Sequence, residues 1–458
     1  MKITLCTHKF KPPFMGGVDV YTDRLRRALI RLGHELTILA FDSSGTMEEG
    51  IALATDEYDG TLVRRVSFPF AGRPKMAFDQ AYDPEMGEIV KTLLQELRPD
   101  IFVAVNFYTI SLAAVEAAKG LGIPVAHVAT DFVPICRRGT FIRWDGRSCE
   151  VGESIQSCAA CFVSHRAVGR VGAALLDKLP EETAVRWANR SLSGNGMHPL
   201  RVFQPYWRHV RVMEERLRVL RPLRHQIDLV LAPTQKTRDI FIANGFKPEQ
   251  VRLQPFGVDL DNPLAQLEHT PSDHVRFMFI GRLQPYKGAD ILVNAFNQLP
   301  NPCGATLTVY GAADDNYAAY FQRLQADMDA NPRLTFAGTI PPWDLHKAFA
   351  QADYFVLPST WHENSPLILL DALQSQTPVI ASDIGGVTDV VKDGANGYLF
   401  PMGDEQALRG LLQRIIDQPD MSASLKPDAY LTPIDEYAQT LVEQTLRQVK
   451  ANELEKHA

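Results

Sequence analysis

Residues 354–372 read YFVLPSTWHENSPLILLDA: a short apolar run, a polar loop and a second apolar stretch. The apolar run 354–357 has the length of a buried parallel strand. Ser365-Pro366 then combines N-cap chemistry with proline at the first helical position, which predicts that a helix starts there. Because the free N–H groups and dipole of such a helix face the crevice at the carboxyl end of the strand, an anion site is expected near Ser365, Pro366 and Leu367.

The same alternation of β-branched runs and amphipathic stretches extends along the chain in two series. It predicts an α/β protein with two Rossmann-like, doubly wound domains. We expect an N-terminal domain at 1–258, a C-terminal domain at 259–430, and a helix within 431–458 that packs back across the domain pair. Residues 136–225 interrupt the first series and are interpreted as an insertion.

The composition of the 458 residues argues against several classes of protein. With 45% hydrophobic and 22% charged residues, two or three full-sized domains are expected, and collagen-like or disordered classes fit poorly. The net charge of −7 gives no reason to expect a nucleic-acid partner. We recognise neither a signal peptide nor an apolar stretch long enough to span a membrane, so a cytoplasmic protein is expected.

The insertion 136–225 is the largest shift in charge along the chain. It holds 15 Arg and one Lys against 8 Asp and Glu, which gives it a charge of about +8 while the remainder carries about −15. Two interpretations are open: a solvated arginine-rich helical face, or a surface for acidic lipid headgroups or an anionic acceptor. The second would bring the protein to the inner face of the membrane.

Two cations follow another predicted strand, at 275–280, in the loop GRLQPYKG (281–288). Arg282 and Lys287 stand on a short loop bounded by glycines, where two cations can hold one diphosphate. A pair of exposed surface cations would give the same pattern. Together with the helix start near Ser365, the loop predicts a pyrophosphate site.

Two carboxylates, Glu363 and Asp371, flank that predicted site. Glu363 stands in the loop before Ser365, and Asp371 lies about one and a half turns inside the helix. Spacing alone is equally compatible with an ordinary loop carboxylate and a satisfied helix residue. No GxGxxG fingerprint or Walker A sequence follows a strand, so the pattern does not support NAD, FAD or a P-loop.

Six stretches together resemble a known family. They are HENSPLILLDA (362–372), TPVIASDIGGV (377–387), DGANG (393–397), PFGVD (255–259), the 281–288 loop and the Gly16-Gly17 loop. The first three are similar to the donor-binding core of glycosyltransferase family 4, whose members are retaining enzymes of the GT-B fold. The resemblance implies two domains that face a central cleft, with the donor in the C-terminal domain and the acceptor on the N-terminal side.

The resemblance also implies roles for individual residues. Arg282 and Lys287 would neutralise the diphosphate of a nucleotide sugar, and Glu363 would bind the donor sugar hydroxyls; these three are the catalytic candidates. The further donor-binding residues that it implies are Gly17 at the diphosphate, Tyr310, Gly311, Thr339 and Ile340 around the base, Asn364, Ser365, Pro366 and Leu367 at the phosphates, and Asp371 at the ribose.

By the same resemblance, the chain would move a hexosyl group from a nucleotide-diphosphate sugar to a saccharide or lipid-linked saccharide, in cell-envelope polysaccharide or glycoconjugate synthesis. The cations and helix N–H groups would stabilise the departing diphosphate, so no catalytic metal is expected. Two alternatives stay open: epimerase or phosphorylase chemistry on the same fold, and a catalytically silent partner that binds nucleotide sugar.

Two positions depart from the family pattern. Asp371 stands where the family usually has Glu, which shortens the implied ribose contact by one methylene. Thr130 stands where the family often carries His before Asp, near the reacting sugar, and His127 is interpreted as a core histidine. A catalytic contribution from the N-terminal domain is therefore not predicted.

Four of the six cysteines, Cys136, Cys149, Cys158 and Cys161, fall in the insertion with the spacing C-x12-C-x8-C-x2-C. In a cytoplasmic chain, cysteines are expected as thiols or metal ligands and not as disulfides. Four thiolates fit a structural tetrahedral zinc site, although the spacing is not that of a standard finger. Buried reduced thiols and a redox pair are the alternatives. Residues 130–149 resemble a segment of some bacterial family 4 enzymes.

Overall fold

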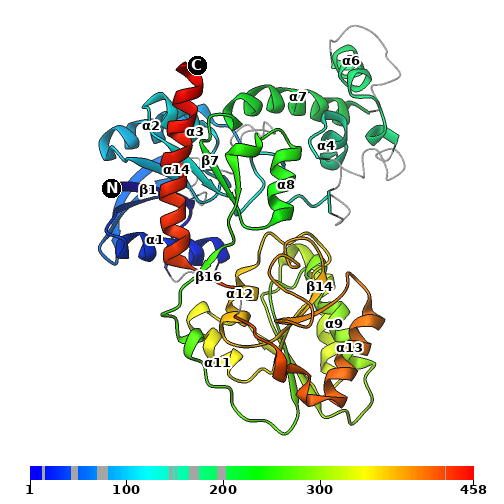
Figure 1. Cartoon of the computed structure of the whole chain (residues 1–458). Coiled ribbons are helices and arrows are strands. Elements are labelled where there is room, and N and C mark those ends of the chain that lie inside the picture. Colours follow the sequence, from blue (N-terminus) through cyan, green and yellow to red (C-terminus); the bar gives the residue numbers. More distant parts are fainter. Residues whose placement is uncertain are drawn as a thin grey trace.

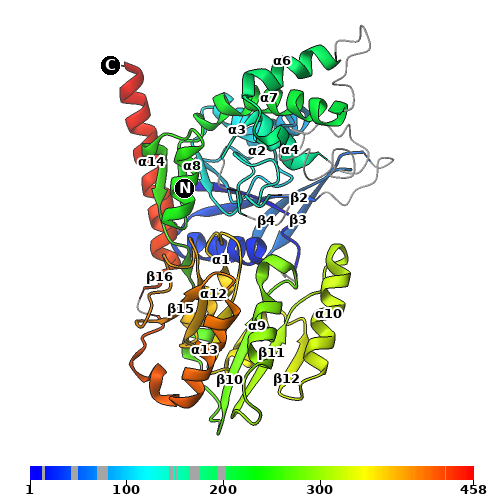
Figure 2. The same cartoon turned by 90° about the vertical axis from the view of Figure 1, so that its right-hand side faces the viewer.

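A computed structural model of the chain describes residues 1–12, 16–42, 50–69, 81–143, 148–149, 152–163, 175–192, 203–428 and 430–457. Two lobes, each built around one β-sheet, face each other, and a helical extension leaves the N-terminal lobe on the side away from the C-terminal lobe (Figures 1 and 2). This arrangement confirms the predicted α/β architecture with two doubly wound domains.

The N-terminal sheet contains, within the described ranges, eight strands in the order β3-β4-β2-β1-β5-β6-β7-β8. Neighbours pair in parallel except β3 and β4, which form an antiparallel hairpin at the edge. The strands are β1 (Lys2–His8), β2 (Glu35–Asp42), β3 (Ala52–Tyr58), β4 (Thr61–Ser67), β5 (Ile101–Ala104), β6 (Val125–Val128), β7 (Leu229–Ala232) and β8 (Val251–Leu253).

The helices of the N-terminal lobe follow from apolar spacing and capping. They are α1 (Gly17–Arg31), α2 (Pro84–Leu97), α3 (Ala113–Gly120) and α8 (Gln235–Ala243), with α4 (Ile155–Phe162), α6 (Glu181–Leu192) and α7 (Gln204–Arg224) in the insertion. Helix α1 buries Tyr21, Leu25 and Leu29, which recur at helical spacing along one face. Asp83 caps α2 by accepting hydrogen bonds from two N–H groups of its first turn.

The C-terminal sheet has six strands in the described structure, all parallel, in the order β12-β11-β10-β13-β14-β15. The strands are β10 (Val275–Ile280), β11 (Ala305–Tyr310), β12 (Leu334–Gly338), β13 (Tyr354–Leu357), β14 (Val379–Asp383) and β15 (Gly397–Pro401). The helices of this lobe are α9 (Ala289–Asn297), α10 (Ala318–Asp329), α11 (Leu345–Phe349), α12 (Leu367–Gln374) and α13 (Glu405–Asp417). Because β10 and β13 are neighbours, the loops after them end at one edge of the sheet.

The last helix returns from the C-terminal lobe to the N-terminal one. Strand β16 (Thr432–Pro433) pairs with β9 (Gly257–Val258), and α14 (Ile434–His457) then packs along α1 and against β6 and β7. Figure 1 shows α14 in red, running the height of the N-terminal lobe. One apolar cluster contains Leu25 of α1, Leu369 of α12 and Tyr437 of α14, so the two lobes share a core. No described helix is both long enough and apolar enough to cross a bilayer.

Candidate active site

Glu363 is a buried carboxylate held by three donors after β13. Its side chain is 3% exposed, and Oε1 accepts hydrogen bonds from Lys287 Nζ at 2.7 Å, Ser359 Oγ at 2.6 Å and Trp361 Nε1 at 2.9 Å. The Lys287 ammonium also lies 4.9 Å from the centre of the Trp361 ring. The fold therefore joins the predicted sugar-binding carboxylate to one of the two predicted diphosphate cations.

The loop that carries Lys287 lies directly on the loop that leads to Glu363. Gly288 has φ +71°, and a Cβ placed there would lie 2.0 Å from the carbonyl oxygen of Pro358. Only glycine permits both the left-handed backbone and this close approach. Arg282, at the start of the same loop, is exposed and makes no ion pair with any described residue. The structure thus engages Lys287 with the carboxylate and leaves Arg282 open to solvent.

Helix α12 starts one residue later than predicted. Pro366 occupies the N-cap position in an extended conformation, and Leu367 is the first helical residue. Ser365 has φ +70°, and its buried Oγ finds no hydrogen-bond partner in the described structure. A serine caps a helix from an extended backbone, so this left-handed turn removes Ser365 from that role. The prediction that Ser365 is the N-cap is wrong, whereas the helix start itself lies where expected.

The N-termini of α1 and α12 meet at the boundary between the lobes. A Cβ on Gly17 would lie 3.8 Å from Leu367 Cδ1, and these two residues begin their helices. Neither helix has a side-chain cap. Figures 1 and 2 both show α1 along the boundary beside α12. Two positive dipole ends with uncapped N–H groups in one place favour an anion.

Asn364 ties this region to the N-terminal lobe. Its Oδ1 accepts a hydrogen bond from Thr237 Oγ1 at 2.5 Å, and its Nδ2 donates a hydrogen bond of 2.5 Å to the carbonyl oxygen of Ala129. Ala129 follows β6, and Thr237 lies in the first turn of α8. The residue next to Glu363 is thus fixed by two segments of the other domain.

Asp371 is paired across the domain boundary with Arg24 of α1. Arg24 Nη2 lies 2.8 Å from Asp371 Oδ1, and each side chain is 5% exposed. The other terminal nitrogen of Arg24, Nη1, is buried without a hydrogen-bond partner in the described structure. The sequence reasoning missed Arg24, although its spacing of seven residues from Gly17 puts both on one helix face.

A pocket of about 330 Å³ lies beside Arg24, between α1 and the C-terminal lobe. Asp23 and Arg27 line it from α1, and Trp343 and His346 line it from the C-terminal lobe. None of the predicted donor-binding residues lines this pocket. It adjoins the predicted site through Arg24, which lines the pocket and pairs with Asp371.

The predicted base-side residues lie at the ends of β11 and β12. Tyr310 is half-buried at the end of β11, and burial raises the pKa of its hydroxyl, which stays protonated at neutral pH. The Gly311 N–H donates to the carbonyl oxygen of Gly338 at 2.8 Å. Thr339 is exposed, and Ile340 packs against the cluster shared by the two lobes.

Thr130 and His127 are engaged in the N-terminal lobe itself. Thr130 Oγ1 donates to the carbonyl oxygen of Val105 at 2.6 Å. The Nδ1–H of His127 donates to the carbonyl oxygen of Ala104 at 3.0 Å. His127 is fully buried, and burial lowers its pKa to about 4, so the ring is neutral at pH 7. This confirms the interpretation of His127 as a core histidine.

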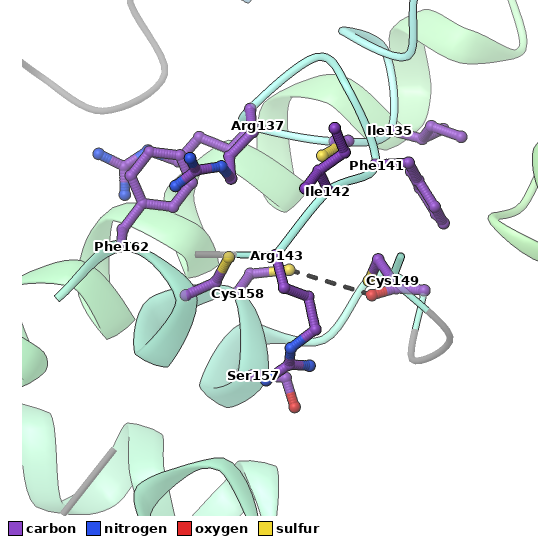
Figure 3. Close-up of a pocket in the computed structure, with 13 residues that line it drawn as sticks. Ile135, Arg137, Phe141, Ile142, Arg143, Cys149, Ser157, Cys158 and Phe162 are labelled. Atoms are coloured by element: carbon purple, nitrogen blue, oxygen red, sulfur yellow. Dashed lines mark hydrogen bonds between the residues drawn. The ribbon is translucent and has the colours of Figure 1, made fainter. Parts of the chain in front are cut away.

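The four cysteines of the insertion line one cavity, shown in Figure 3. No disulfide joins cysteines in the described part of the chain. Burial raises the pKa of the Cys136 thiol, and that of Cys158 to about 12. In the ranges that the structure describes, no three His, Cys, Asp or Glu side chains already stand together as a group able to hold a metal ion.

Part of the positive charge of the insertion is already paired with its own carboxylates. Among the described residues, four arginines form ion pairs with carboxylates of the insertion, namely Arg143 with Asp177, Arg211 with Glu214, Arg218 with Glu215 and Arg224 with Glu153. Arg216 and Arg224 are buried. The count of arginines therefore overstates the charge available to a partner.

Two family models match the chain, one in each lobe. Residues 15–138 match glycosyltransferase family 4, and residues 266–432 match the group 1 glycosyl transferases. The second match contains the loop of Lys287, Glu363 and the whole of α12. The chain belongs to glycosyltransferase family 4.

Curated relatives of this family 4 chain match over part of their length. A D-inositol 3-phosphate glycosyltransferase of Acidothermus cellulolyticus is 30% identical over 212 residues, which cover 43% of this chain and 47% of the relative. The sulfoquinovosyl transferase SQD2 of Arabidopsis thaliana is 29% identical over 199 residues, 41% of this chain and 37% of the relative. The match thus spans about half the length of these relatives, or less.

Solved structures with the same fold cover nearly the whole family 4 chain. A sucrose-phosphate synthase from Thermosynechococcus elongatus matches with a TM-score of 0.59 at 18% identity, over 100% of both chains. The catalytic domain of starch synthase IV from Arabidopsis thaliana, bound to ADP and acarbose, matches with a TM-score of 0.62 at 16% identity, over 98% of this chain and 99% of that one. Anabaena HepE in complex with UDP-glucose matches with a TM-score of 0.55 at 17% identity, over 99% of each. These likenesses establish the GT-B fold.

Proposed function

We propose that this chain is a retaining glycosyltransferase that moves a hexosyl group from a nucleotide-diphosphate sugar to an acceptor. The observation that carries the proposal is the ion pair of Lys287 and Glu363, set next to two uncapped helix N-termini from different domains. A carboxylate, two cations and converging N–H groups are what a sugar joined to a diphosphate requires.

The donor diphosphate would lie between the starts of α1 and α12. Lys287 would lie between this diphosphate position and Glu363. Its ammonium would then bridge the Glu363 carboxylate and a phosphate oxygen. Arg282, exposed at the other end of the same loop, would close on the diphosphate when it binds. Glu363 would accept hydrogen bonds from the sugar hydroxyls, and Asp371 with Arg24 would lie at the ribose.

Cleavage of the bond between the sugar and the diphosphate puts negative charge on the departing phosphate oxygen. Lys287, Arg282 and the helix N–H groups would stabilise that charge. Lys287 and the helix N–H groups stand in place before the donor binds, and Arg282 would join them on binding. Proton transfer by His127 is not part of this mechanism, since its ring is buried and hydrogen-bonded to Ala104. The chain's own cations supply the charge stabilisation that a metal would otherwise provide.

The acceptor would enter from the N-terminal lobe, next to the Ala129 segment that binds Asn364. We infer a saccharide or lipid-linked saccharide, used in cell-envelope polysaccharide or glycoconjugate synthesis. Arg208 and Arg221 are exposed on α7 and would contribute to any contact with an anionic membrane surface. Sedimentation with vesicles of anionic lipid tests this contact; a protein that stays in the supernatant at low salt has none.

The deciding experiment offers the purified chain a panel of UDP-, GDP- and ADP-sugars. Thermal shift and release of free nucleoside diphosphate are measured in parallel for the parent, Lys287→Ala and Lys426→Ala. Lys426 is an exposed lysine of the same lobe and serves as the matched control. We expect one donor to raise the melting temperature and to be slowly hydrolysed, with both effects lost in Lys287→Ala and kept in Lys426→Ala.

Other outcomes point elsewhere. Conversion of the donor sugar into an isomer would indicate an epimerase, and sugar phosphate formed with inorganic phosphate a phosphorylase. A donor that binds but is never cleaved, with or without candidate acceptors, would indicate a silent nucleotide-sugar-binding partner. If no donor shifts the melting temperature, the proposed diphosphate site is wrong.

A further inference from the structure

The cysteine cavity lies where the insertion joins the N-terminal lobe, and the proposed sugar transfer makes no use of it. Cys136, Cys149, Cys158 and Cys161 all line it, and its volume is about 30 Å³. Cys136 and Cys149 pack against the apolar core of the N-terminal lobe, whereas Cys158 packs against the separate core of the insertion. Four thiols from three chain segments therefore meet between two hydrophobic cores.

The backbone fixes each thiol near the cavity. Cys158 and Cys161 lie one turn apart on α4, so their side chains share a helix face. The Cys136 N–H donates to the carbonyl oxygen of Phe132 at 2.6 Å, and the Cys149 N–H donates to that of Phe141 at 2.8 Å. Figure 3 shows Cys158 on α4 and Cys149 on the facing segment, with the hydrogen bond from Cys158 towards the Gly152 carbonyl. Rotation about one side-chain bond is the freedom left to each sulfur.

A buried positive charge near the thiols has no ion-pair partner among the described residues. Arg216 of α7 is 1% exposed, donates from Nη2 to the carbonyl oxygen of Val133, and forms no ion pair with any described residue. Its Nε is buried without a hydrogen-bond partner in the described structure. The guanidinium interacts electrostatically first with Glu153 and then with Cys136 and Cys158. Arg224, however, already binds both carboxylate oxygens of Glu153 and repels the Arg216 guanidinium.

A buried guanidinium calls for a nearby negative charge, because isolated charges are costly inside a protein. Neutral thiols do not provide one. Four thiolates around Zn²⁺ carry two net negative charges and would compensate Arg216 together with Arg137, which also lines the cavity. A disulfide between two of the cysteines would leave the region positive. The two arginine charges therefore favour a metal thiolate centre over neutral thiols and over a disulfide.

We propose that Cys136, Cys149, Cys158 and Cys161 bind one structural zinc ion. Binding would release four thiol protons to solvent as four Zn–S bonds of about 2.3 Å form in tetrahedral geometry. As the side chains stand, they do not form a ready metal group, so the four sulfurs must turn into the cavity on binding. The cavity has room for about two water molecules. One ion fits that space, and a cluster of several iron and sulfide atoms does not.

The zinc site would position the insertion against the donor loop. Ser148 precedes Cys149, and its Oγ accepts a hydrogen bond from the His362 N–H at 3.3 Å. His362 is the residue before Glu363. Because Cys149 would be a zinc ligand, the metal would hold this contact between the N-terminal lobe and the candidate active site. Its role is structural and positioning, and its presence is measurable without any donor or acceptor.

The test is the metal content of the full chain, purified under reducing conditions without chelators or affinity metals. Elemental analysis is made on the parent, Cys158→Ser, Cys161→Ser, Cys161→His and Cys303→Ser. Cys303 lies in the C-terminal lobe and is the matched control. We expect about one zinc per chain in the parent and in Cys303→Ser, a loss in both serine variants, and retention in Cys161→His, because imidazole also binds zinc. Replacement by Co²⁺ should give the absorption of tetrahedral cobalt with thiolate charge transfer.

Three results would overturn the proposal. The first is a parent chain without zinc that, titrated with Zn²⁺ while folded, still takes up none. The second is iron with a visible absorption band, which would identify an iron–sulfur cluster instead. The third is zinc that persists in both serine variants. The failure of the sugar-transfer proposal would change none of these measurements, because no step of the test involves a nucleotide sugar.

Discussion

Arg24 and Asp371 form an ion pair between the two domains, 347 positions apart in the chain and 2.8 Å apart in the structure. Helix α1 supplies the cation and α12 the carboxylate, and both side chains are 5% exposed. The residue that the resemblance places at the donor ribose therefore also joins the domains. Ribose binding at Asp371, which we propose above, would therefore be coupled to the relative position of the two helices.

Replacing Arg24 should destabilise the protein strongly. Arg24→Met leaves the Asp371 carboxylate buried without a counter-charge, and such a loss costs about 3–5 kcal/mol. The double variant Arg24→Met/Asp371→Leu should recover part of that free energy of unfolding, because no charge is left unpaired. Urea unfolding measures the cycle, with Arg218→Met in an exposed pair as the control of small effect. Additive effects of the two replacements would contradict the coupling.

Glu363→Gln should remove activity while leaving the fold. The amide keeps the volume and one acceptor oxygen but loses the charge that pairs with Lys287 and that we propose for binding the sugar hydroxyls. We expect donor hydrolysis to fall by about 10²-fold or more, the scale of losing one key polar contact in an active site. The rate is measured beside Glu436→Gln, an exposed carboxylate of α14. A normal rate in Glu363→Gln would exclude the carboxylate from the reaction.

Gly386→Ala should damage the donor site through the backbone. Gly386 has φ +93°, and a Cβ there would lie 1.7 Å from the carbonyl oxygen of Glu363. The loop after β14 must move for an alanine to fit, and Glu363 must move with it. Gly394→Ala is the matched control, since Gly394 has φ +71° with open space around the missing Cβ. We expect both variants to lose stability and Gly386→Ala alone to lose the donor-induced thermal shift.

His127 should make the protein less stable in acid. Its pKa is lowered to about 4 in the folded state from an ordinary value of 6.5. Between these two values the unfolded chain binds a proton that the folded chain does not, so the free energy of unfolding decreases as the pH falls from about 6.5 to about 4, by roughly 3 kcal/mol.

Unfolding of His127→Asn measured across that pH range should show a shallower decrease, whatever the stability of the variant at pH 7. Asparagine keeps a donor for the Ala104 carbonyl and does not titrate. His225→Asn, at an exposed histidine, should keep the slope of the parent. An equal slope in His127→Asn and the parent would show that the folded protein already admits a proton at this position.

Local pattern predicted the strand β13 and helix α12 because both carry their own signals: an apolar run, a proline and helical spacing. It placed Lys287 and Glu363 at neighbouring strand ends for the same reason. Edge strand β3 was missed because its side chains are almost all exposed and show no alternation of apolar and polar residues. When neither face of a strand is buried, its hydrophobic pattern does not indicate that it pairs with another strand.

The capping error and the missed ion pair have a different origin. The pattern predicts Ser365 as an N-cap because Ser-Pro usually starts a helix, but the Ser365 backbone is left-handed, with φ +70°. Arg24 and Asp371 each look like ordinary polar residues of a helix. Their pairing depends on how the two domains face each other, and nothing near either residue in the sequence encodes that.

The return of α14 to the N-terminal lobe has a consequence for the order of synthesis. Ile434, Tyr437 and Leu441 belong to the same apolar cluster as Tyr21 of α1, and the Tyr21 and Tyr437 rings meet edge to face with centres 5.8 Å apart. During synthesis on the ribosome, the N-terminal domain is made first. This face of α1 therefore stays uncovered until residues 434–457 have been made, after the whole C-terminal domain. A fragment of residues 1–258 would expose this apolar surface and should therefore be poorly soluble. Fusing α14 to the fragment should restore its solubility.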